Sequence, residues 1–156
     1  MIGGLLWLAA GAAATVHSPG VEAHLASLVG DWTRVGKETT YRDHCVWFDR
    51  RAFVVCSLSD KASGLRVEAI VGYSKDDERY TYESYSNEGK SHVQYGFALG
   101  ANGIVFTDES NVNATPMRLT TSIMPEPDGR LHMTQDRSVR GGPWQQVGEV
   151  YYVPRK

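Results

Sequence analysis

The chain has 156 residues, of which 42% are hydrophobic and 22% charged, and its formal net charge is −2. This length accommodates one well-buried domain and is too short for two ordinary ones. The balanced charge argues against a nucleic-acid partner, because such a partner requires a basic surface on the protein.

The first segment, MIGGLLWLAAGAAATVHS, has no acidic or basic side chain and passes from an apolar run at 5–10 to small residues. Its alanines at 12–14 provide a small-x-small cleavage site, so residues 1–14 are predicted to be a secretory signal peptide. The mature chain would begin near Thr15 and be periplasmic or secreted. The apolar run is much shorter than the roughly 20 residues of a membrane span, so no stable membrane insertion is expected. A basic n-region is missing, and an apolar helix packed on the domain stays open as the alternative.

The first element of the domain is predicted to be a short helix. The serine and proline at 18–19 suit the cap and the first turn of a helix. Val21, Leu25 and Leu28 follow at i, i+4 and i+7, which places one apolar stripe on the helix. Gly30 ends this run, so the helix has two to three turns.

From Trp32 onward, short runs rich in Val, Ile, Thr and Tyr alternate with turn residues, a pattern typical of strands. Strands are predicted near 31–37, 40–48, 52–59, 64–73, 78–86, 90–98, 103–109, 117–124, 130–139 and 145–153. No gap between them is long enough for a helix, which indicates an antiparallel meander. About ten twisted strands in this order close into a barrel, because closure removes the exposed edges. The prediction is one all-β domain at 18–156, an antiparallel up-and-down barrel with a short N-terminal helix.

Both cysteines of the chain lie in HCVWFDRRAFVVCS, residues 44–57. Cys45 and Cys56 are symmetrical about a turn at Arg50–Arg51, so a hairpin places them opposite each other on one face. An oxidising compartment favours a disulfide between them. A structural zinc site would need four ligands with closer spacing, so no metal is expected. Two reduced, buried thiols and a redox pair are the alternatives.

The same hairpin is apolar on both faces. One face carries the cysteines with Trp47 and Val54, and the other carries Val46, Phe48, Phe53 and Val55. An apolar outer face needs a cover, and two are open: the N-terminal helix, or a second copy of the chain in a homodimer.

Other predicted strands alternate between apolar and polar residues, as a barrel wall between lumen and water requires. The apolar phase is assigned to the lumen, where tyrosines would offer both apolar area and a hydroxyl to orient a ligand. The predicted lumen residues are Tyr80, Tyr82, Tyr95, Phe97, Leu119, Ile123, Met133 and Tyr151. A slip of one residue would exchange inside for outside, replacing Tyr82 by Glu83, Phe97 by Gly96 and Met133 by His132.

Several stretches resemble a known group of proteins. A short helix followed by LVGDWT, with its Gly30-Asp31-Trp32, is similar to the entry into lipocalin-like (calycin) barrels. The order of three further stretches resembles a family of exported bacterial lipocalin-like barrels known only as a domain of unknown function: CVWFDRRAFVVC, IVGYSKDDERYTYESYSNEG and DRSVRGGPWQQVGEVYY. The resemblance covers about 20–153. It implies a lipocalin-like fold and a binding protein, and it provides no catalytic residues.

Trp32 is expected to have a structural role. A large ring beside a glycine on the first strand can plug the closed end of a barrel. Arg137 and Arg79 are candidate cation–π partners for it, and an ordinary core tryptophan is the alternative.

The sequence lacks the spacings of a phosphate loop, a serine hydrolase elbow or a histidine metal site, so neither a catalytic residue nor a cofactor is assigned. The preferred hypothesis is an exported barrel that binds a small apolar or amphipathic molecule in its lumen without catalysis. One alternative is a structural or interaction module with a filled core. The other is an enzyme or a haem carrier resembling nitrobindins, for which His92 and His132 are the strand candidates.

Overall fold

The computed structural model describes residues 17–112 and 114–156. These residues form one helix, α1 (Pro19–Ala26), and ten strands, whose bounds are β1 (Gly30–Arg34), β2 (Tyr41–Phe48), β3 (Phe53–Asp60), β4 (Leu65–Ser74), β5 (Arg79–Ser86), β6 (Ser91–Leu99), β7 (Gly103–Val112), β8 (Thr115–Pro125), β9 (Leu131–Val139) and β10 (Gln145–Pro154). The predicted signal peptide and the mature start near Thr15 lie outside the described residues.

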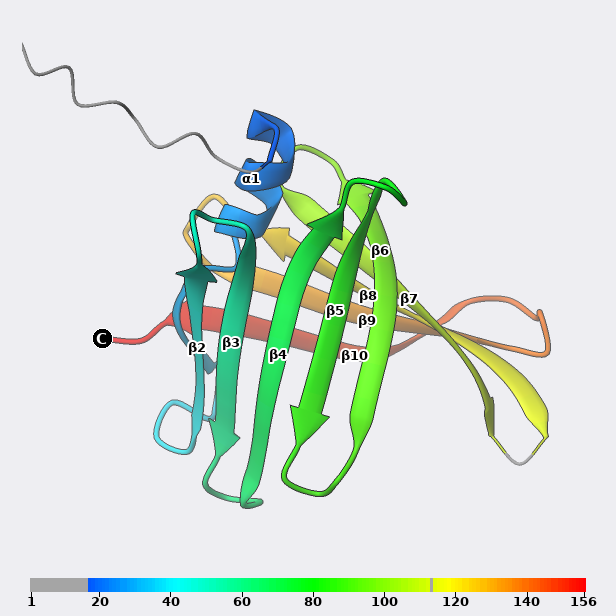
Figure 1. Ribbon diagram of the computed structural model, residues 1–156. Coiled ribbons are helices and arrows are strands. Elements are labelled where there is room, and N and C mark those ends of the chain that lie inside the picture. The colour runs from blue at the N-terminus through cyan, green and yellow to red at the C-terminus, as the bar shows by residue number, and fades with distance from the viewer. Residues whose placement is uncertain (1–16, 113) are drawn as a thin grey trace, which may run out of the picture.

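The strands form one closed antiparallel barrel in which each strand pairs with its neighbours in sequence (Figure 1). The ring closes between β1 and β10, where Trp32 lies opposite Pro154 and Arg34 lies opposite Tyr152. The predicted all-β up-and-down barrel of about ten strands with a short N-terminal helix is therefore confirmed.

Helix α1 covers the end of the barrel at which β2 joins β3 and β4 joins β5 (Figure 1). Leu25 is fully buried, and Leu28, just beyond the helix, is nearly so. His24 is also buried, and its Nδ1 atom lies 2.7 Å from the hydroxyl of Tyr80. The predicted apolar stripe thus packs onto the barrel end rather than onto the barrel wall. Among the described residues, no helix has the length and apolar character to span a membrane.

Trp32 is buried beside the end of the helix, and its indole Nε1 donates a hydrogen bond to the Leu28 carbonyl at 2.9 Å. A Cβ atom on Gly30 would lie 2.9 Å from Cε2 of this ring, so a glycine is needed two residues before the tryptophan. The expected cation–π partners are wrong, because Arg79 packs 3.7 Å from the ring centre of Tyr95 and no arginine of the described chain lies over Trp32.

The Cys45–Cys56 disulfide is present, in the predicted register. Both cysteines are buried on the inner face of the barrel. The outer face of this hairpin carries the exposed ring of Phe48, stacked on Phe53 with 4.7 Å between the ring centres. Helix α1 packs on the barrel end and leaves this outer face exposed, so the helix does not provide the expected cover. The homodimer stays a prediction.

Candidate functional site

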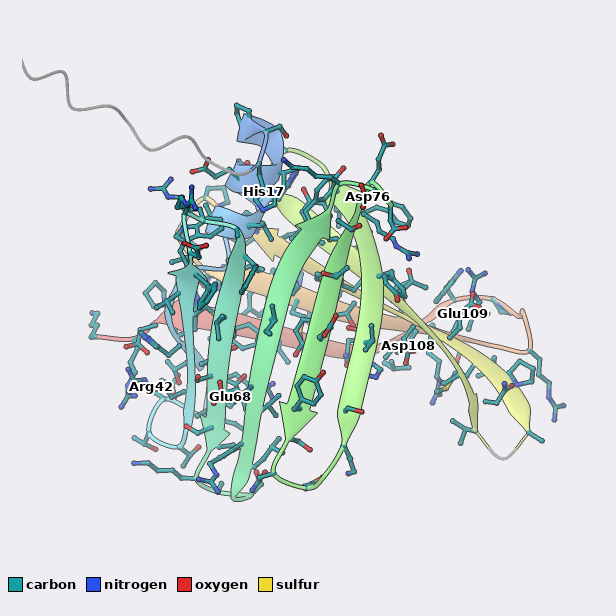
Figure 2. The ribbon with its side chains drawn as sticks, viewed as in Figure 1. His17, Arg42, Glu68, Asp76, Asp108 and Glu109 are labelled. Atoms are coloured by element: carbon teal, nitrogen blue, oxygen red, sulfur yellow. A yellow bond between two sulfur atoms is a disulfide. The ribbon has the colours of Figure 1, made fainter. Side chains whose placement is uncertain are left out.

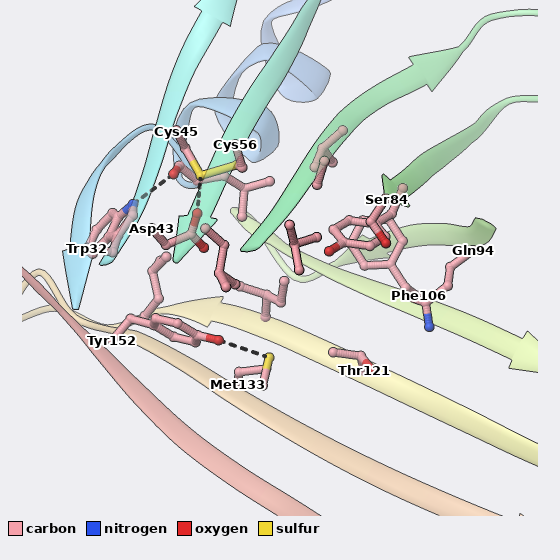
Figure 3. Close-up of a pocket in the computed structure, with 18 of the residues that line it drawn as sticks. Trp32, Asp43, Cys45, Cys56, Ser84, Gln94, Phe106, Thr121, Met133 and Tyr152 are labelled. Atoms are coloured by element: carbon pink, nitrogen blue, oxygen red, sulfur yellow. Dashed lines mark hydrogen bonds between the residues drawn. A yellow bond between two sulfur atoms is a disulfide. The ribbon is translucent and has the colours of Figure 1, made fainter. Parts of the chain in front are cut away.

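The barrel encloses a cavity of about 320 Å³ that is partly open to solvent (Figure 3). Most of its wall is apolar, because inward-facing positions of six strands carry aliphatic or aromatic side chains. These residues are Leu58, Val67, Ala69, Val71, Tyr82, Phe106, Leu119, Ile123, Leu131 and Met133. Trp32, Leu28 and the disulfide complete the apolar wall near the helix.

On three strands the structure has the predicted inward phase. Tyr82 on β5, Leu119 and Ile123 on β8, and Met133 on β9 all line the cavity. Tyr80 also faces inward and is buried, but its hydroxyl contacts His24 under the helix rather than the cavity.

The predicted lumen positions on β6 are wrong. Tyr95 is 43% exposed and Phe97 is 59% exposed. Gln94, which precedes Tyr95 and has the opposite phase, is buried and lines the cavity. The inward position at Gly96 has no side chain because the Phe106 ring of β7 fills that space: a Cβ atom there would lie 2.7 Å from Phe106 Cδ1. Phe106 thus supplies the apolar core that the pattern assigned to β6.

The predicted lumen position on β10 is also wrong. Tyr152 faces inward and lines the cavity, whereas Tyr151 stacks outside on His132, with 4.4 Å between the ring centres. Two consecutive tyrosines satisfy either phase, so alternation gives no preference between them. The pairing of β9 with β10 also shifts register between Gln146 and Gly148, which changes the phase along the strand.

At one end of the cavity, Arg34 on β1 lies between two tyrosine rings. Its Cζ atom is 4.2 Å from the ring centre of Tyr41 and 5.4 Å from that of Tyr152. One guanidinium nitrogen, Nη2, donates to the Tyr152 hydroxyl at 3.2 Å. The Nε atom is buried without a hydrogen-bond partner in the described part of the chain. The positive charge is therefore held in place by two rings but retains a free donor.

Asp43 on β2 reaches the same end of the cavity (Figure 3). Burial raises the pKa of its carboxyl group to about 6 from the ordinary 3.8, although Arg34 and His44 act in the opposite direction. Its Oδ1 atom lies 3.6 Å from Cys45 Sγ. That sulfur carries no hydrogen in the disulfide, so this contact gives the carboxylate no proton donor.

Asp43, Cys45 and Cys56 bring a carboxylate oxygen and two sulfurs within 4.8 Å of one another. Metal binding by cysteine requires thiolates, and both sulfurs are engaged in the disulfide. This cluster is therefore a feature of the cavity wall rather than a metal centre in the oxidised protein.

Across the cavity from Asp43, the wall carries uncharged polar groups. Ser84, Gln94, Thr121 and Gln135 face inward among the apolar side chains, and Gln135 Nε2 donates to Thr121 Oγ1 at 3.3 Å. Figure 3 shows Asp43 on one side, with Ser84, Gln94 and Thr121 on the other. The cavity thus has a charged end, an apolar middle and a weakly polar far wall.

The two candidate haem ligands differ in position. His92 lines the cavity with its side chain 44% exposed, and its Nε2 atom lies 3.6 Å from Asp108 Oδ2, so it marks the opening. His132 lies on the outside, with Nε2 2.8 Å from Glu149 Oε1. A haem carrier would thus have one lumen histidine, His92, rather than two candidates.

No protein-family model and no curated protein matches this sequence. The lipocalin-like resemblance therefore stays a prediction, and the cavity itself carries the functional argument.

Arg34 and Asp43, the two oppositely charged residues of the cavity, were not among the predicted lumen residues. Glu68 on β4 is exposed on the outer surface (Figure 2), where it accepts a hydrogen bond from Ser57 at 2.6 Å. The signal for Asp43 was present, because Cys45 faces the lumen and a residue two positions earlier shares its face. Arg34 is likewise two positions after Trp32 on β1, so it shares the inward face on which Trp32 lines the cavity.

Proposed function

We propose that this protein is an exported binding protein that holds a small amphipathic molecule in its barrel lumen, with no catalytic step. The observation that carries the proposal is the cavity of about 320 Å³, with an apolar wall and a few convergent polar groups. Ligand sites have roughly 300–1,000 Å³ and this combination of a mostly apolar lining with a small number of polar side chains.

The disulfide supports the compartment part of the proposal. Such bonds persist in oxidising environments, which agrees with the signal peptide predicted at 1–14. The bond links two strands of the cavity wall, so it also stiffens the site in which the ligand would bind.

The cavity volume favours binding over a structural module with a filled core. A module of that kind would pack its inward side chains to the density of a protein interior and leave few voids larger than a water molecule.

A haem carrier is distinguished by its spectrum, since protein purified from its native host would show a Soret band.

The binding test uses a fluorescent naphthalene sulfonate probe. It should bind the folded protein with micromolar affinity and quench tryptophan fluorescence, because Trp32 lines the cavity. Ala69 faces the lumen and is buried, so Ala69→Phe should fill the cavity and abolish binding. Ile70 is the adjacent exposed residue, and Ile70→Phe is the matched control that should bind normally.

Circular dichroism establishes that both variants are folded. Equal probe binding by Ala69→Phe and the wild type would place the probe on the exposed apolar outer face instead, and would contradict the proposal. If Ala69→Phe abolishes probe binding, mass spectrometry of small molecules that co-purify with the native protein would identify the ligand.

A further inference from the structure

The charged end of the cavity contains two side chains of opposite charge that do not pair with each other. Arg34 and Asp43 come from neighbouring strands and both line the cavity. Within residues 17–112 and 114–156, no ion pair of 4.0 Å or less joins them. They are still close enough for the Arg34 charge to act on Asp43. A gap therefore lies between a fixed cation and a fixed carboxyl group.

Each of the two groups has unused hydrogen-bonding capacity. Arg34 lines the cavity and has five N–H donors, of which one donates to the Tyr152 hydroxyl, while Asp43 faces a disulfide sulfur that has no proton to donate. Buried polar groups are nearly always hydrogen-bonded, and an unmet one has a substantial free-energy cost. A free donor and a free acceptor at one end of a cavity are complementary to a ligand that provides one of each.

We propose that this end of the cavity is the head-group site and that it takes an uncharged head with adjacent acceptor and donor atoms, such as a primary carboxamide. The carbonyl oxygen accepts a hydrogen bond from Arg34, and the amide N–H donates one to Asp43. The apolar tail of the ligand then extends along the aliphatic wall. This inference rests on the proposed function and names the ligand class for the same cavity.

A head group with a net charge fits this end less well. A carboxylate beside Arg34 would also lie near the like charge of Asp43, and an ammonium beside Asp43 would lie near Arg34. Like charges in a partly desolvated site oppose binding strongly. An amide makes both favourable contacts without either repulsion.

Other groups around Asp43 leave this balance in place. His44 is the next residue on β2, and the negative charge of Glu68 on β4 disfavours ionisation of Asp43. The hydroxyls of Tyr41 and Tyr82 lie on β2 and β5. None of these is a fixed cation within the cavity wall. Because the pKa of Asp43 is about 6, its carboxylate is ionised at pH 7.5.

The test compares three ligands that share a ten-carbon chain: decanamide, decanoic acid and decylamine. Each competes with the naphthalene sulfonate probe at pH 7.5. Decanamide should displace the probe at a concentration about tenfold lower than either charged ligand, because it alone satisfies both groups. Equal or tighter binding of decanoic acid in the wild type would overturn the inference.

Asp43→Asn makes the test specific. It removes the like charge and adds an amide donor, so decanoic acid should gain about tenfold and become at least equal to decanamide. Asp76→Asn, an exposed change in the turn after β4, is the matched control and should leave the ratios of the three affinities unchanged. Unchanged ratios in a folded Asp43→Asn variant would overturn the head-group assignment.

The two proposals fail in different ways. If the probe does not bind the wild type, or still binds Ala69→Phe, the proposed function is overturned and this inference with it. If the probe occupies the cavity but decanamide has no advantage, only the head-group assignment is wrong.

Discussion

The hydroxyl of Tyr80 and the Nδ1 atom of His24 lie 2.7 Å apart, although 56 residues separate them in the sequence. The other imidazole nitrogen of His24 lies 3.3 Å from the Gly100 carbonyl. An Nε2–H tautomer satisfies both contacts, since Nδ1 then accepts from Tyr80 and Nε2 donates to Gly100. One buried imidazole thus joins α1 to β5 and to the turn after β6.

Tyr80→Phe should destabilise the protein by about 1–2 kcal/mol, because it leaves a buried imidazole nitrogen without its partner. Urea unfolding measures the change, and hydrogen exchange should show faster opening of α1. Tyr85 is 56% exposed, so Tyr85→Phe is a matched control with an expected change within about 0.5 kcal/mol. Equal effects of the two substitutions would mean that the contact does not stabilise the helix.

Gly30→Ala should destabilise the protein by about 1–3 kcal/mol, because the added methyl group overlaps the Trp32 ring. The near-ultraviolet circular dichroism of tryptophan should change as well. Gly20 in α1 has no atom within 4 Å of an added Cβ, so Gly20→Ala should be neutral or slightly stabilising. A neutral Gly30→Ala variant would show that the ring moves aside freely.

Replacing both cysteines by alanine should lower the free energy of unfolding by about 2–3 kcal/mol, as expected for a cross-link that closes a short loop. The wild type under reducing conditions should show a similar loss. Intact mass after alkylation should reveal two free thiols only when a reductant is present. Two alkylated thiols without reductant would contradict the disulfide.

Asp43 should make the stability of the protein depend on pH in a defined direction. Its pKa is about 6 in the folded state and near 3.8 when unfolded, so between these values the folded state binds more protons. Stability from this group is therefore present at low pH and lost as the pH rises through about 4 to 6.

The difference between the wild type and Asp43→Asn isolates this contribution. Relative to the variant, the wild type should lose up to about 3 kcal/mol between pH 4 and pH 7, as measured by urea unfolding. Asp76→Asn, an exposed change in the turn after β4, should show no such trend. A pH-independent difference for Asp43→Asn would mean that the carboxyl group is fully solvated.

The strands and the disulfide could be predicted because their signals are local. Turn residues separate short β-prone runs, and the symmetrical spacing of Cys45 and Cys56 fixes one hairpin register. Inside and outside could be predicted only where one phase of a strand is clearly apolar, as at Leu119 and Ile123 on β8. On β6, the pattern pointed the wrong way because the Phe106 ring from the neighbouring strand occupies the core at Gly96.

The charged end of the site could not be predicted from alternation by itself. Charged residues are normally read as exposed, since burying an isolated charge has a large cost in free energy. Arg34 escapes that cost through two tyrosine rings, that of Tyr41 on the next strand and that of Tyr152 across the barrel closure. The position of Tyr152 opposite Arg34 depends on the closure of β1 onto β10, which the alternation pattern of single strands does not specify.

Because the disulfide faces the lumen, the rate of its reduction depends on whether the lumen is occupied. Both sulfurs are almost inaccessible from outside and lie in the cavity wall, so a small thiol must enter the lumen to attack them. A ligand bound in the lumen, as proposed, would occupy that route and slow the attack. The rate at which a small thiol reduces the native protein therefore reports how often the lumen is filled, without a label and before the ligand is known.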